Sequence, residues 1–342
     1  MAKAPQRQPT PSPASANEST PTRAGSGEAR STRPKAGVRS GSQPRSRWPR
    51  WGVELGAFAA VVTVGLLAWW LLSFLNRGDD GNDTGARPIA TLKSPDVHSL
   101  LIDPNDADHI LFGSHAGIQE SRDGGFTWNP GSLRNADAMS LAGGGQPLAT
   151  LYAAGHNVFQ ISRDGGQTWQ SAQHNLPGGD LHAFAQDPND PLRLYTLVAG
   201  MGLFTSGDGG TTWKPLPAVP PGAGMHIPLA AGSAALYAAT ESGIAVTRDG
   251  GTTWESLTAP PGKGVMSLAV SGADSRTIYA ATSSGLAKST DAGTSWLSVG
   301  PAGIPALALA VAPSDPNRVL FVAEGGDVYR TNDGGASWSA PR

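Results

Sequence analysis

The octapeptide Ser121-Arg122-Asp123-Gly124-Gly125-Phe126-Thr127-Trp128 is the first of six near-identical copies of one motif. Each copy follows the pattern Ser/Thr-x-Asp-x-Gly-x-Thr/Ser-Trp, and the copies occupy residues 121–128, 162–169, 206–213, 247–254, 289–296 and 331–338. Successive motif tryptophans are separated by 41, 44, 41, 42 and 42 residues. This period is typical of one β-propeller blade, so a single supersecondary unit is predicted to occur six times.

The apolar pattern of each repeat predicts four short strands. In the first repeat we expect strands at 97–102, 110–113 and 118–121, and a fourth at 126–128 and slightly beyond. No helical periodicity competes with this pattern after residue 90. The predicted fold class is therefore all-β, a six-bladed β-propeller at residues 89–342. Residues 88–92 are expected to pair as an extra outer strand that helps to close the ring.

The residue types of the motif indicate a tight turn between two strands. Asp and Ser/Thr side chains accept hydrogen bonds from nearby backbone N–H groups, and glycine tolerates positive φ. In the fifth copy Ala292 replaces the first glycine while Gly293 is kept, so only the second glycine is expected to need positive φ. The motif tryptophans are expected to pack against their own or the adjacent blade. The predicted structural residues are Asp123, Asp164, Asp208, Asp249, Asp291, Asp333, Trp128, Trp169, Trp213, Trp254, Trp296 and Trp338.

The motif resembles the Asp-box, or BNR, repeat of sialidases, sortilin-type receptors, xyloglucanases and photosystem II assembly-factor propellers. The resemblance covers about residues 95–340 and includes all six copies. The chain is also similar to exported bacterial Asp-box proteins that carry a glycosyl hydrolase label. The resemblance implies that the boxes lie on the outer part of each blade, away from any active site.

The first 88 residues differ in composition from the repeats. Residues 1–50 are rich in Pro, Ser, Gly and Arg and hold ten Lys and Arg against Glu18 and Glu28, which predicts a disordered cytoplasmic tail. We expect a transmembrane helix at 52–75, because residues 55–75 carry no charge and are long enough to cross the bilayer. An acidic spacer follows at 76–88. A cleaved signal peptide is the alternative, but the preceding basic stretch is too long for its n-region.

Charge sets the expected orientation and excludes some partners. Basic residues precede the helix, whereas Asp79, Asp80 and Asp83 follow it, so we expect a single-pass plasma-membrane protein with a cytoplasmic N-terminus and an extracytoplasmic propeller. From Gly78 onward 14 Lys and Arg face 24 Asp and Glu, a net charge of −10 that disfavours nucleic acid. The chain has no cysteine, which excludes disulfides and thiolate metal sites, and no cofactor is expected.

The sequence assigns no catalytic residue. A sialidase needs an arginine cluster, but Arg122, Arg163 and Arg248 occupy the variable second position of the motif, and the Phe-Arg-Ile-Pro motif of sialidases is absent. Other glycosidases need two carboxylates close together. Glu241 and Glu324 occupy matching loops between the second and third strands, but in blades four and six, which are not neighbours. An exo-acting glycoside hydrolase is therefore the alternative to a binding or scaffold role.

Alignment of the repeats collects histidines on one face of the predicted disc. In a blade, the inner strand begins on the same face as the loop between the second and third strands, opposite the motif turns. The inner strands begin at His98, Met139, His182, His226, Met266 and Pro305. The adjacent loops add further polar residues, so the candidate ligand-face residues are His98, Met139, His182, His226, Met266, His115, His156, Glu241 and Glu324.

This face leads to two open hypotheses about metals. Copper or zinc would bind through His98, His182 and His226 with the two methionines as soft ligands; alternatively, these histidines pack between blades. No metal is assigned. Calcium at the Asp-Pro-Asn turns is a further alternative, although turn formation already explains those residues. The sequence as a whole predicts a membrane-anchored, extracytoplasmic propeller that binds a protein, glycan or cell-envelope partner.

Overall fold

The structure is a computed structural model that describes residues 86–94, 96–144, 150–224, 227–233 and 235–338. The described residues belong to one compact unit, Gly81–Arg342. Among them there is no helix of the length and apolar character needed to cross a membrane. The tail predicted at 1–50, the helix predicted at 52–75 and residues 76–85 of the predicted spacer lie outside the described residues.

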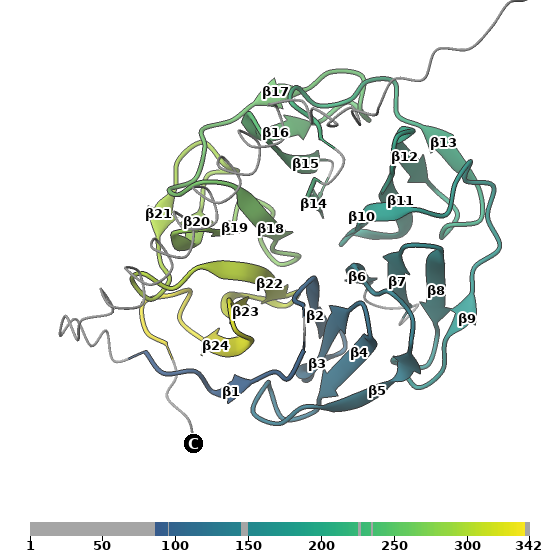
Figure 1. Cartoon of the computed structure of the whole chain (residues 1–342). Helices are drawn as coiled ribbons and strands as arrows, with labels where there is room; N and C mark the ends of the chain where they lie inside the picture. Colours follow the sequence, from purple (N-terminus) through teal and green to yellow (C-terminus); the bar gives the residue numbers. More distant parts are fainter. Residues whose placement is uncertain (1–85, 95, 145–149, 225–226, 234, 339–342) are drawn as a thin grey trace, which may run out of the picture. The chain divides into compact units, whose positions relative to one another are not determined.

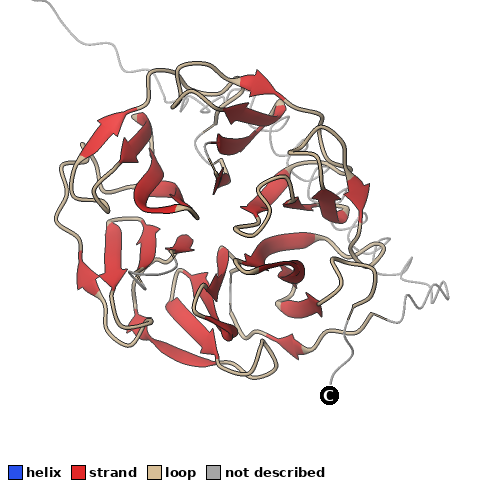
Figure 2. Ribbon diagram, turned by 180° about the vertical axis from the view of Figure 1, so that it is seen from behind, coloured by secondary structure: helices blue, strands red, loops and turns tan. Residues whose placement is uncertain are grey.

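Six four-stranded antiparallel sheets surround a central channel and form six blades (Figure 1), which confirms the predicted all-β propeller. The described residues form strands and loops without helices (Figure 2). Blades 1 to 3 consist of β2 (Ser99–Asp103), β3 (Asp106–Ser114), β4 (Gly117–Ser121) and β5 (Asn129–Arg134); β6 (Ser140–Gly143), β7 (Leu151–Gly155), β8 (Val158–Ser162) and β9 (Gln170–Ser171); and β10 (Leu181–Asp187), β11 (Asp190–Val198), β12 (Gly202–Ser206) and β13 (Trp213–Pro215).

The remaining three blades follow the same order from the centre to the rim. They consist of β14 (Leu229–Gly232), β15 (Ala235–Thr240), β16 (Gly243–Thr247) and β17 (Glu255–Ser256); β18 (Val265–Val270), β19 (Ile278–Thr282), β20 (Gly285–Ser289) and β21 (Leu297–Ser298); and β22 (Ala306–Ala312), β23 (Asp315–Ala323), β24 (Asp327–Thr331) and β1 (Ala90–Thr91).

The short strand β1 joins the beginning of the propeller to its last blade (Figure 1). It pairs antiparallel with β24, and the backbone N–H groups of Ile89 and Leu92 donate to the carbonyls of Val328 and Gly326, both at 2.8 Å. The predicted closing strand is confirmed. However, β1 is not an extra strand, because it occupies the fourth position of blade 6 in the described part of the chain.

The strand boundaries differ from the prediction at the two ends of the blade. The strand β5 begins at Asn129 rather than Phe126, because the residues before Trp128 are held in the motif turn. The strand β3 begins early, at Asp106, because Asp103 Oδ1 accepts the N–H of Asn105 at 2.8 Å and makes the turn tight. The Asp-Pro-Asn segments therefore act as turns in the structure.

The motif aspartate is the hydrogen-bond acceptor of its own turn. In the first copy, Ser121 Oγ accepts the N–H of Gly125 at 2.8 Å and donates to Asp123 Oδ1 at 2.8 Å. Asp123 also accepts the N–H and the hydroxyl of Thr127, at 2.9 and 2.8 Å. The hydroxyl-to-carboxylate bond and the glycine N–H bond recur in the other five copies.

The prediction that only the second glycine needs positive φ is wrong. Both motif glycines have positive φ, for example Gly250 at 71° and Gly251 at 85°. Ala292 adopts the same conformation, with φ of 60°. Replacement by alanine at this position is therefore accommodated at a backbone cost, because an L-residue in the left-handed region brings its Cβ close to the following carbonyl.

Five of the six motif tryptophans donate a hydrogen bond from Nε1 to nearby backbone; the exception is Trp169, whose buried Nε1 has no hydrogen-bond partner within the described residues. Trp213 is buried, and its Nε1 donates to the carbonyl of Gly210 in the same turn at 2.8 Å. Trp296 Nε1 instead donates to Thr258 in the preceding repeat at 3.0 Å, and Trp338 Nε1 donates similarly to Val299 at 2.8 Å. The indole groups thus link successive blades as well as closing their own turns.

Every blade is packed between two neighbours. One core cluster joins Leu100 and Phe112 of blade 1 to Ala308 and Leu320 of blade 6. The second strands are consequently buried over most of their length; all five residues of β19 and the last five residues of β11 and β23 are buried. This explains why the second strands have continuous apolar runs instead of the alternation of a half-exposed strand.

Replacement of Asp208 by alanine is expected to lower the thermal unfolding midpoint. The hydrogen bond from the N–H of Thr212, followed by those from the hydroxyls of Ser206 and Thr212, lowers the pKa of Asp208 from 3.8 to about 2. A carboxyl group with a lowered folded-state pKa stabilises the fold above its unfolded-state pKa and loses that contribution as the pH falls through the folded-state value. The difference in midpoint between the wild type and Asp208→Ala, measured by circular dichroism, should shrink from pH 4 to pH 2.

Thr211→Ala is the matched control for this measurement. Thr211 lies in the same turn, is exposed, and makes no side-chain hydrogen bond within the described residues, so its midpoint should match that of the wild type. Two results would contradict the assigned role of the carboxylate. One is an equal decrease in unfolding midpoint for Asp208→Ala and Thr211→Ala, and the other is a midpoint difference between the wild type and Asp208→Ala that does not change with pH.

Ala292→Gly is expected to stabilise the protein by about 0.5–1 kcal/mol, because it removes the cost of positive φ and this outweighs the greater entropy of the unfolded chain. Gly250→Ala is the reverse change at the equivalent position of the preceding repeat. A Cβ there would meet no atom within 4 Å, so only the backbone cost is added. In urea unfolding, the two variants should change the free energy of unfolding in opposite directions. Changes in the same direction would show that side-chain packing, and not φ, determines the preferred residue at this position.

Candidate functional site

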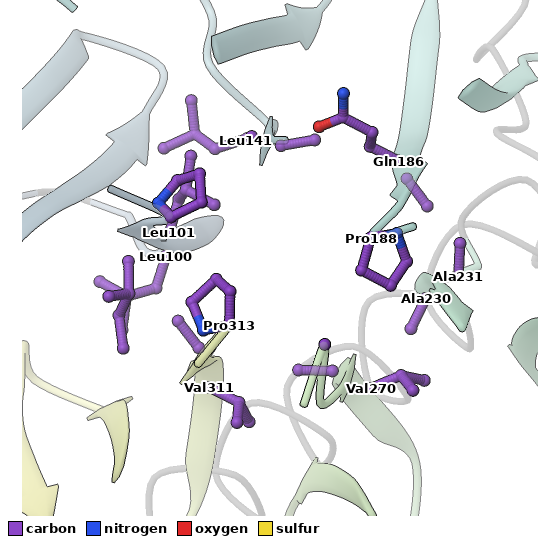
Figure 3. Close-up of a pocket in the computed structure, with 18 of the residues that line it drawn as sticks. Leu100, Leu101, Leu141, Gln186, Pro188, Ala230, Ala231, Val270, Val311 and Pro313 are labelled. Carbon is purple, nitrogen blue, oxygen red and sulfur yellow. The ribbon is translucent and has the colours of Figure 1, made fainter. Parts of the chain in front are cut away.

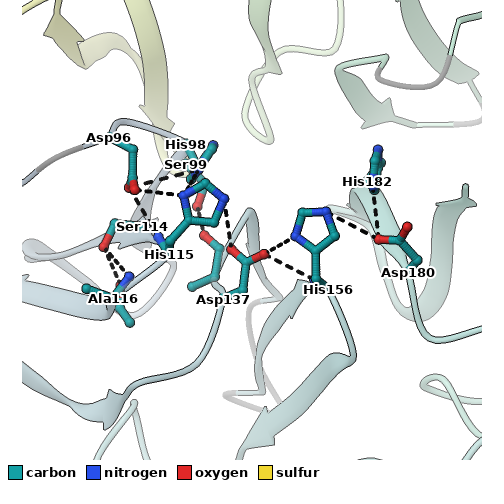
Figure 4. Close-up of polar contacts among 12 residues, drawn as sticks. Asp96, His98, Ser99, Ser114, His115, Ala116, Asp137, His156, Asp180 and His182 are labelled. Carbon is teal, nitrogen blue, oxygen red and sulfur yellow. Dashed lines mark hydrogen bonds and ion pairs between the residues drawn. The ribbon is translucent and has the colours of Figure 1, made fainter.

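Seven side chains of blades 1 to 3 form a continuous polar row on the face where the inner strands begin (Figure 4). His98 directly precedes β2 and His182 lies in β10, whereas His115 and His156 lie in the turns that follow β3 and β7. Aspartates lie between these imidazoles. We call the set the histidine–aspartate row; it consists of Asp96, His98, His115, Asp137, His156, Asp180 and His182.

Asp96 fixes the first two imidazoles of the row. Its Oδ1 accepts the backbone N–H of His115 at 3.1 Å, and its Oδ2 lies 2.7 Å from His115 Nδ1. His98 Nε2 lies 3.0 Å from His115 Nδ1 and 3.9 Å from Asp96 Oδ1. The two rings are nearly perpendicular, with centroids 4.3 Å apart. Three ligand-type atoms therefore converge at this end of the row.

Asp137 and Asp180 connect the remaining imidazoles. Asp137 Oδ2 contacts His156 Nδ1 and accepts the backbone N–H of His156 at 3.2 Å, while Asp137 Oδ1 lies 4.0 Å from His115 Nε2. Asp180 Oδ1 lies 3.5 Å from His156 Nε2 and 3.0 Å from His182 Nε2. Both nitrogens of His156 thus face a carboxylate.

Exposure divides the row into accessible and covered groups. The side chains of His115 and His156 are 51% and 45% exposed, whereas Asp137 between them is 11% exposed. Burial, followed by the charge of His115, lowers the pKa of His98, whereas the hydrogen bond to Asp96 raises the pKa of His115. Adjacent imidazoles therefore have opposite protonation preferences. Groups of this kind can transfer protons, bind polar groups of a partner or ligate a transition metal.

The three aspartates of the row were missed in the sequence. Each stands two residues before the aligned position occupied by His98, Met139 or His182 in its repeat. Extending the repeat alignment by two positions would have found them. The equivalent residues of blades 4 to 6 are all glycine, namely Gly224, Gly264 and Gly303.

The structure places the other candidate residues outside the row. Met139 and Met266 line the central channel near the beginnings of the inner strands. His98 and His182 lie beside them around the same cavity of about 90 Å³. Glu241 and Glu324 lie in the loops that follow β15 and β23.

The hypothetical metal set of three histidines is divided in the structure. His98 is grouped with His115 and His182 is grouped with His156. The third member, His226, lies outside the described residues.

The rest of the channel is lined mainly by apolar side chains (Figure 3). It holds a cavity of about 320 Å³ lined by inner-strand residues such as Leu100, Leu141 and Val311, with proline residues towards its end. Gln186 is the polar side chain labelled in this view, and its Nε2 donates to the carbonyl of Pro191 at 2.7 Å. The side chains that line the channel therefore change from His98 and His182 near the row to mainly apolar groups along the inner strands.

A second histidine network is buried at the opposite end of blade 1. His109 is 2% exposed, with Nδ1 at 2.9 Å from Asp103 Oδ2 and Nε2 at 3.3 Å from Glu120 Oε2. Burial opposes the charged form of Asp103, but the hydrogen bonds from His109 and Asn105 outweigh it and lower the pKa of Asp103. This network joins β2, β3 and β4 and is covered by the blade, which indicates a structural role.

Comparisons with known proteins agree with this architecture. The BNR/Asp-box repeat profile matches residues 160–171, and no curated protein matches the chain. A protein provisionally named a gluconolactonase is 17% identical with a TM-score of 0.54, over 74% of this chain and 93% of that one. At this identity the likeness shows the fold alone.

Two further similar structures have lower TM-scores. YCF48 bound to D1 peptide is 19% identical, with a TM-score of 0.47 over 75% of this chain and 82% of that one. The GH74 xyloglucanase from Xanthomonas campestris is 17% identical, with a TM-score of 0.46 over 72% of this chain and 46% of that one, so the chain spans about half of the enzyme's length. The chain is thus a six-bladed β-propeller with six hydrogen-bonded motif turns, the second of which lies within the match to the BNR/Asp-box repeat profile.

Proposed function

We propose that this protein is a membrane-anchored, extracytoplasmic binding module that docks a protein partner on the face of the propeller carrying the histidine–aspartate row. The observation that carries the proposal is the coincidence of this row with exposed apolar side chains. Five large hydrophobic side chains are exposed among the described residues, and three of them, Met201, Val219 and Met266, belong to segments of this face.

The positions of these three residues follow from the strand connections. Met201 lies in the turn between β11 and β12, on the same face as the corresponding turns that carry His115 and His156. Val219 lies in the connection from β13 to β14, which reaches this face because the carbonyl of Gly222 accepts the N–H of Glu241 at 3.2 Å. Methionine and other large apolar groups beside polar ones are characteristic of protein-binding surfaces.

A glycoside hydrolase is supported less well by the same face. A glycosidase requires two carboxylates close together, and Asp96, Asp137 and Asp180 lie in one row. However, His115 lies between the first two and His156 between the last two. The imidazoles thus fill the space in which a glycosidic oxygen or a water molecule would have to sit, so binding is the better-supported role.

The membrane part of the proposal rests on the sequence. Residues 55–75 are uncharged over a length that crosses a bilayer, and the ten basic residues before residue 51 favour retention of the N-terminus in the cytoplasm. The spacer would then place the propeller, with its acidic surface, on the outer side of the membrane.

This topology can be tested by cysteine labelling, because the chain contains no cysteine. Ser298→Cys lies on an exposed outer strand of the propeller, and Ser15→Cys lies in the basic tail. A membrane-impermeant maleimide should label Ser298→Cys in intact cells or spheroplasts, and Ser15→Cys only after lysis. The reverse pattern, or recovery of the chain in the soluble fraction, would contradict the proposed topology.

The docking surface can be tested by capture of partners from cell envelopes. The double variant Met201→Glu with Met266→Glu is expected to lose the captured protein, because two charges replace side chains that are 55% and 47% exposed on the proposed interface.

Leu297→Glu is the control for the capture experiment, because Leu297 is 74% exposed on β21 at the rim, away from the row. This variant should retain the partner, and all variants should keep the wild-type unfolding midpoint. If the double variant still captures the partner, or if only Leu297→Glu fails to capture it, the interface lies elsewhere.

A further inference from the structure

We infer that one end of the histidine–aspartate row is a binding site for a divalent transition metal, with zinc as the best-suited ion. The proposed ligands are His156 Nε2, His182 Nε2 and Asp180 Oδ1, which we call the blade 2–3 site. Two imidazoles and one carboxylate form a donor set that zinc accepts, and it leaves coordination positions open. This inference does not depend on which partner docks on the propeller.

The distances between the proposed ligand atoms fit a zinc ion. Ligand atoms at about 2.1 Å from a tetrahedral zinc ion are about 3.4 Å apart. Asp180 Oδ1 lies 3.0 Å from His182 Nε2 and 3.5 Å from His156 Nε2, and the ligand atoms of the cluster lie within 4.8 Å of one another. Small rotations of the side chains would therefore complete the coordination.

The hydrogen bonds of the site favour a metal over a purely hydrogen-bonded network. Asp180 Oδ1 is buried and makes no hydrogen bond of acceptable geometry, although imidazole nitrogens lie nearby. This oxygen and the two imidazole nitrogens thus surround one point, and the hydrogen-bonding capacity of the oxygen is not satisfied there. A cation at that point would compensate the buried carboxylate oxygen.

Asp137 supplies the supporting interaction that metal-bound histidines usually have. Its Oδ2 contacts His156 Nδ1 and accepts the backbone N–H of the same residue at 3.2 Å. This contact directs the Nε2 atom of His156 towards Asp180 and His182. A carboxylate behind a ligating imidazole fixes the ring and raises its basicity.

The backbone holds the ligand-bearing segments together. His156 and Asp180 form an antiparallel bridge, and the N–H of Asn157 donates to the carbonyl of Gly179 at 2.8 Å. The carbonyl of Asp180 accepts the N–H of Ala199 at 2.9 Å. The site is therefore preorganised by two blades, which lowers the entropic cost of metal binding.

The other end of the row is less suited to a metal. At that end His115 Nδ1 lies 2.7 Å from Asp96 Oδ2 and 3.0 Å from His98 Nε2. Hydrogen bonds shared among these three groups already account for such short separations. The inference is accordingly restricted to the blade 2–3 site.

The test is zinc titration of the full chain in detergent by isothermal calorimetry. The chain should be purified through a streptavidin-binding tag, because a polyhistidine tag would bind zinc, and it should be stripped with a chelator. We expect saturable binding of one zinc ion per chain. His182→Ala and Asp180→Ala should each weaken binding by at least about 10-fold, and Asp137→Asn by about 10- to 100-fold.

Two matched controls separate this site from adventitious binding by imidazoles. His174→Ala removes a histidine that packs against Phe159 outside the row, and His98→Ala removes one from its other end. Both should keep the wild-type affinity. Cobalt(II), used as a spectroscopic probe, should give visible absorption that is lost in His182→Ala. Unfolding midpoints measured with chelator should show that each variant is folded.

Three outcomes would overturn the inference. The first is the absence of saturable binding at about 100 μM zinc, far above the range expected for a built site. The second is binding that is unchanged in folded Asp180→Ala. The third is a loss in His98→Ala equal to that in His182→Ala, which would place the ion outside the blade 2–3 site.

Discussion

Each sheet in this propeller buries its central strands against neighbouring blades on both faces, and the rest of the structure depends on this constraint. A blade with an uncovered face would expose a wide apolar surface to water, so the series of blades must close into a ring. Closure is made by β1, whose two residues pair with β24 in the last blade. The strand is short, but it joins segments that are more than 230 residues apart and completes the fourth sheet position of blade 6.

The two kinds of recurring aspartate serve different purposes. The motif aspartates lie in turns and accept hydrogen bonds from backbone and hydroxyl groups of their own repeat, so their charge is satisfied locally. The aspartates of the histidine–aspartate row instead contact imidazoles of their own and adjacent blades. The repeated motif aspartates therefore maintain the fold. The repeated aspartates of the row instead bring side chains of successive blades together on one face.

The face of the propeller is asymmetric although the fold is repetitive. Blades 1 to 3 carry aspartate two residues before the aligned position of His98, Met139 and His182, whereas blades 4 to 6 carry glycine at the equivalent place. The polar row consequently covers one part of the face, and Met266 is exposed on another part. Such departures from the repeat distinguish the residues available for recognition from those that every blade needs in order to fold.

The sequence by itself determined the number of blades, their register and the role of the motif turns. It did so because hairpin turns and strands are local and recur with the period of the repeat. The octapeptide also identified the opposite face, where His98, His115, His156 and His182 lie. The prediction for Ala292 was wrong. The alanine at the first glycine position of the motif was interpreted as a sign that this position does not need positive φ, whereas Ala292 itself has positive φ.

Only the tertiary structure decided which of these side chains meet. His98 and His182 belong to different groups, and each is paired with a histidine from a loop, because the angle between blades sets distances that spacing along the chain does not encode. Asp137, for example, lies in the connection leading to β6 and contacts His156 across 19 residues. That contact lies within blade 2, whereas the approach of Asp137 Oδ1 to His115 Nε2 of blade 1, at 4.0 Å, exists only because two blades meet at this face.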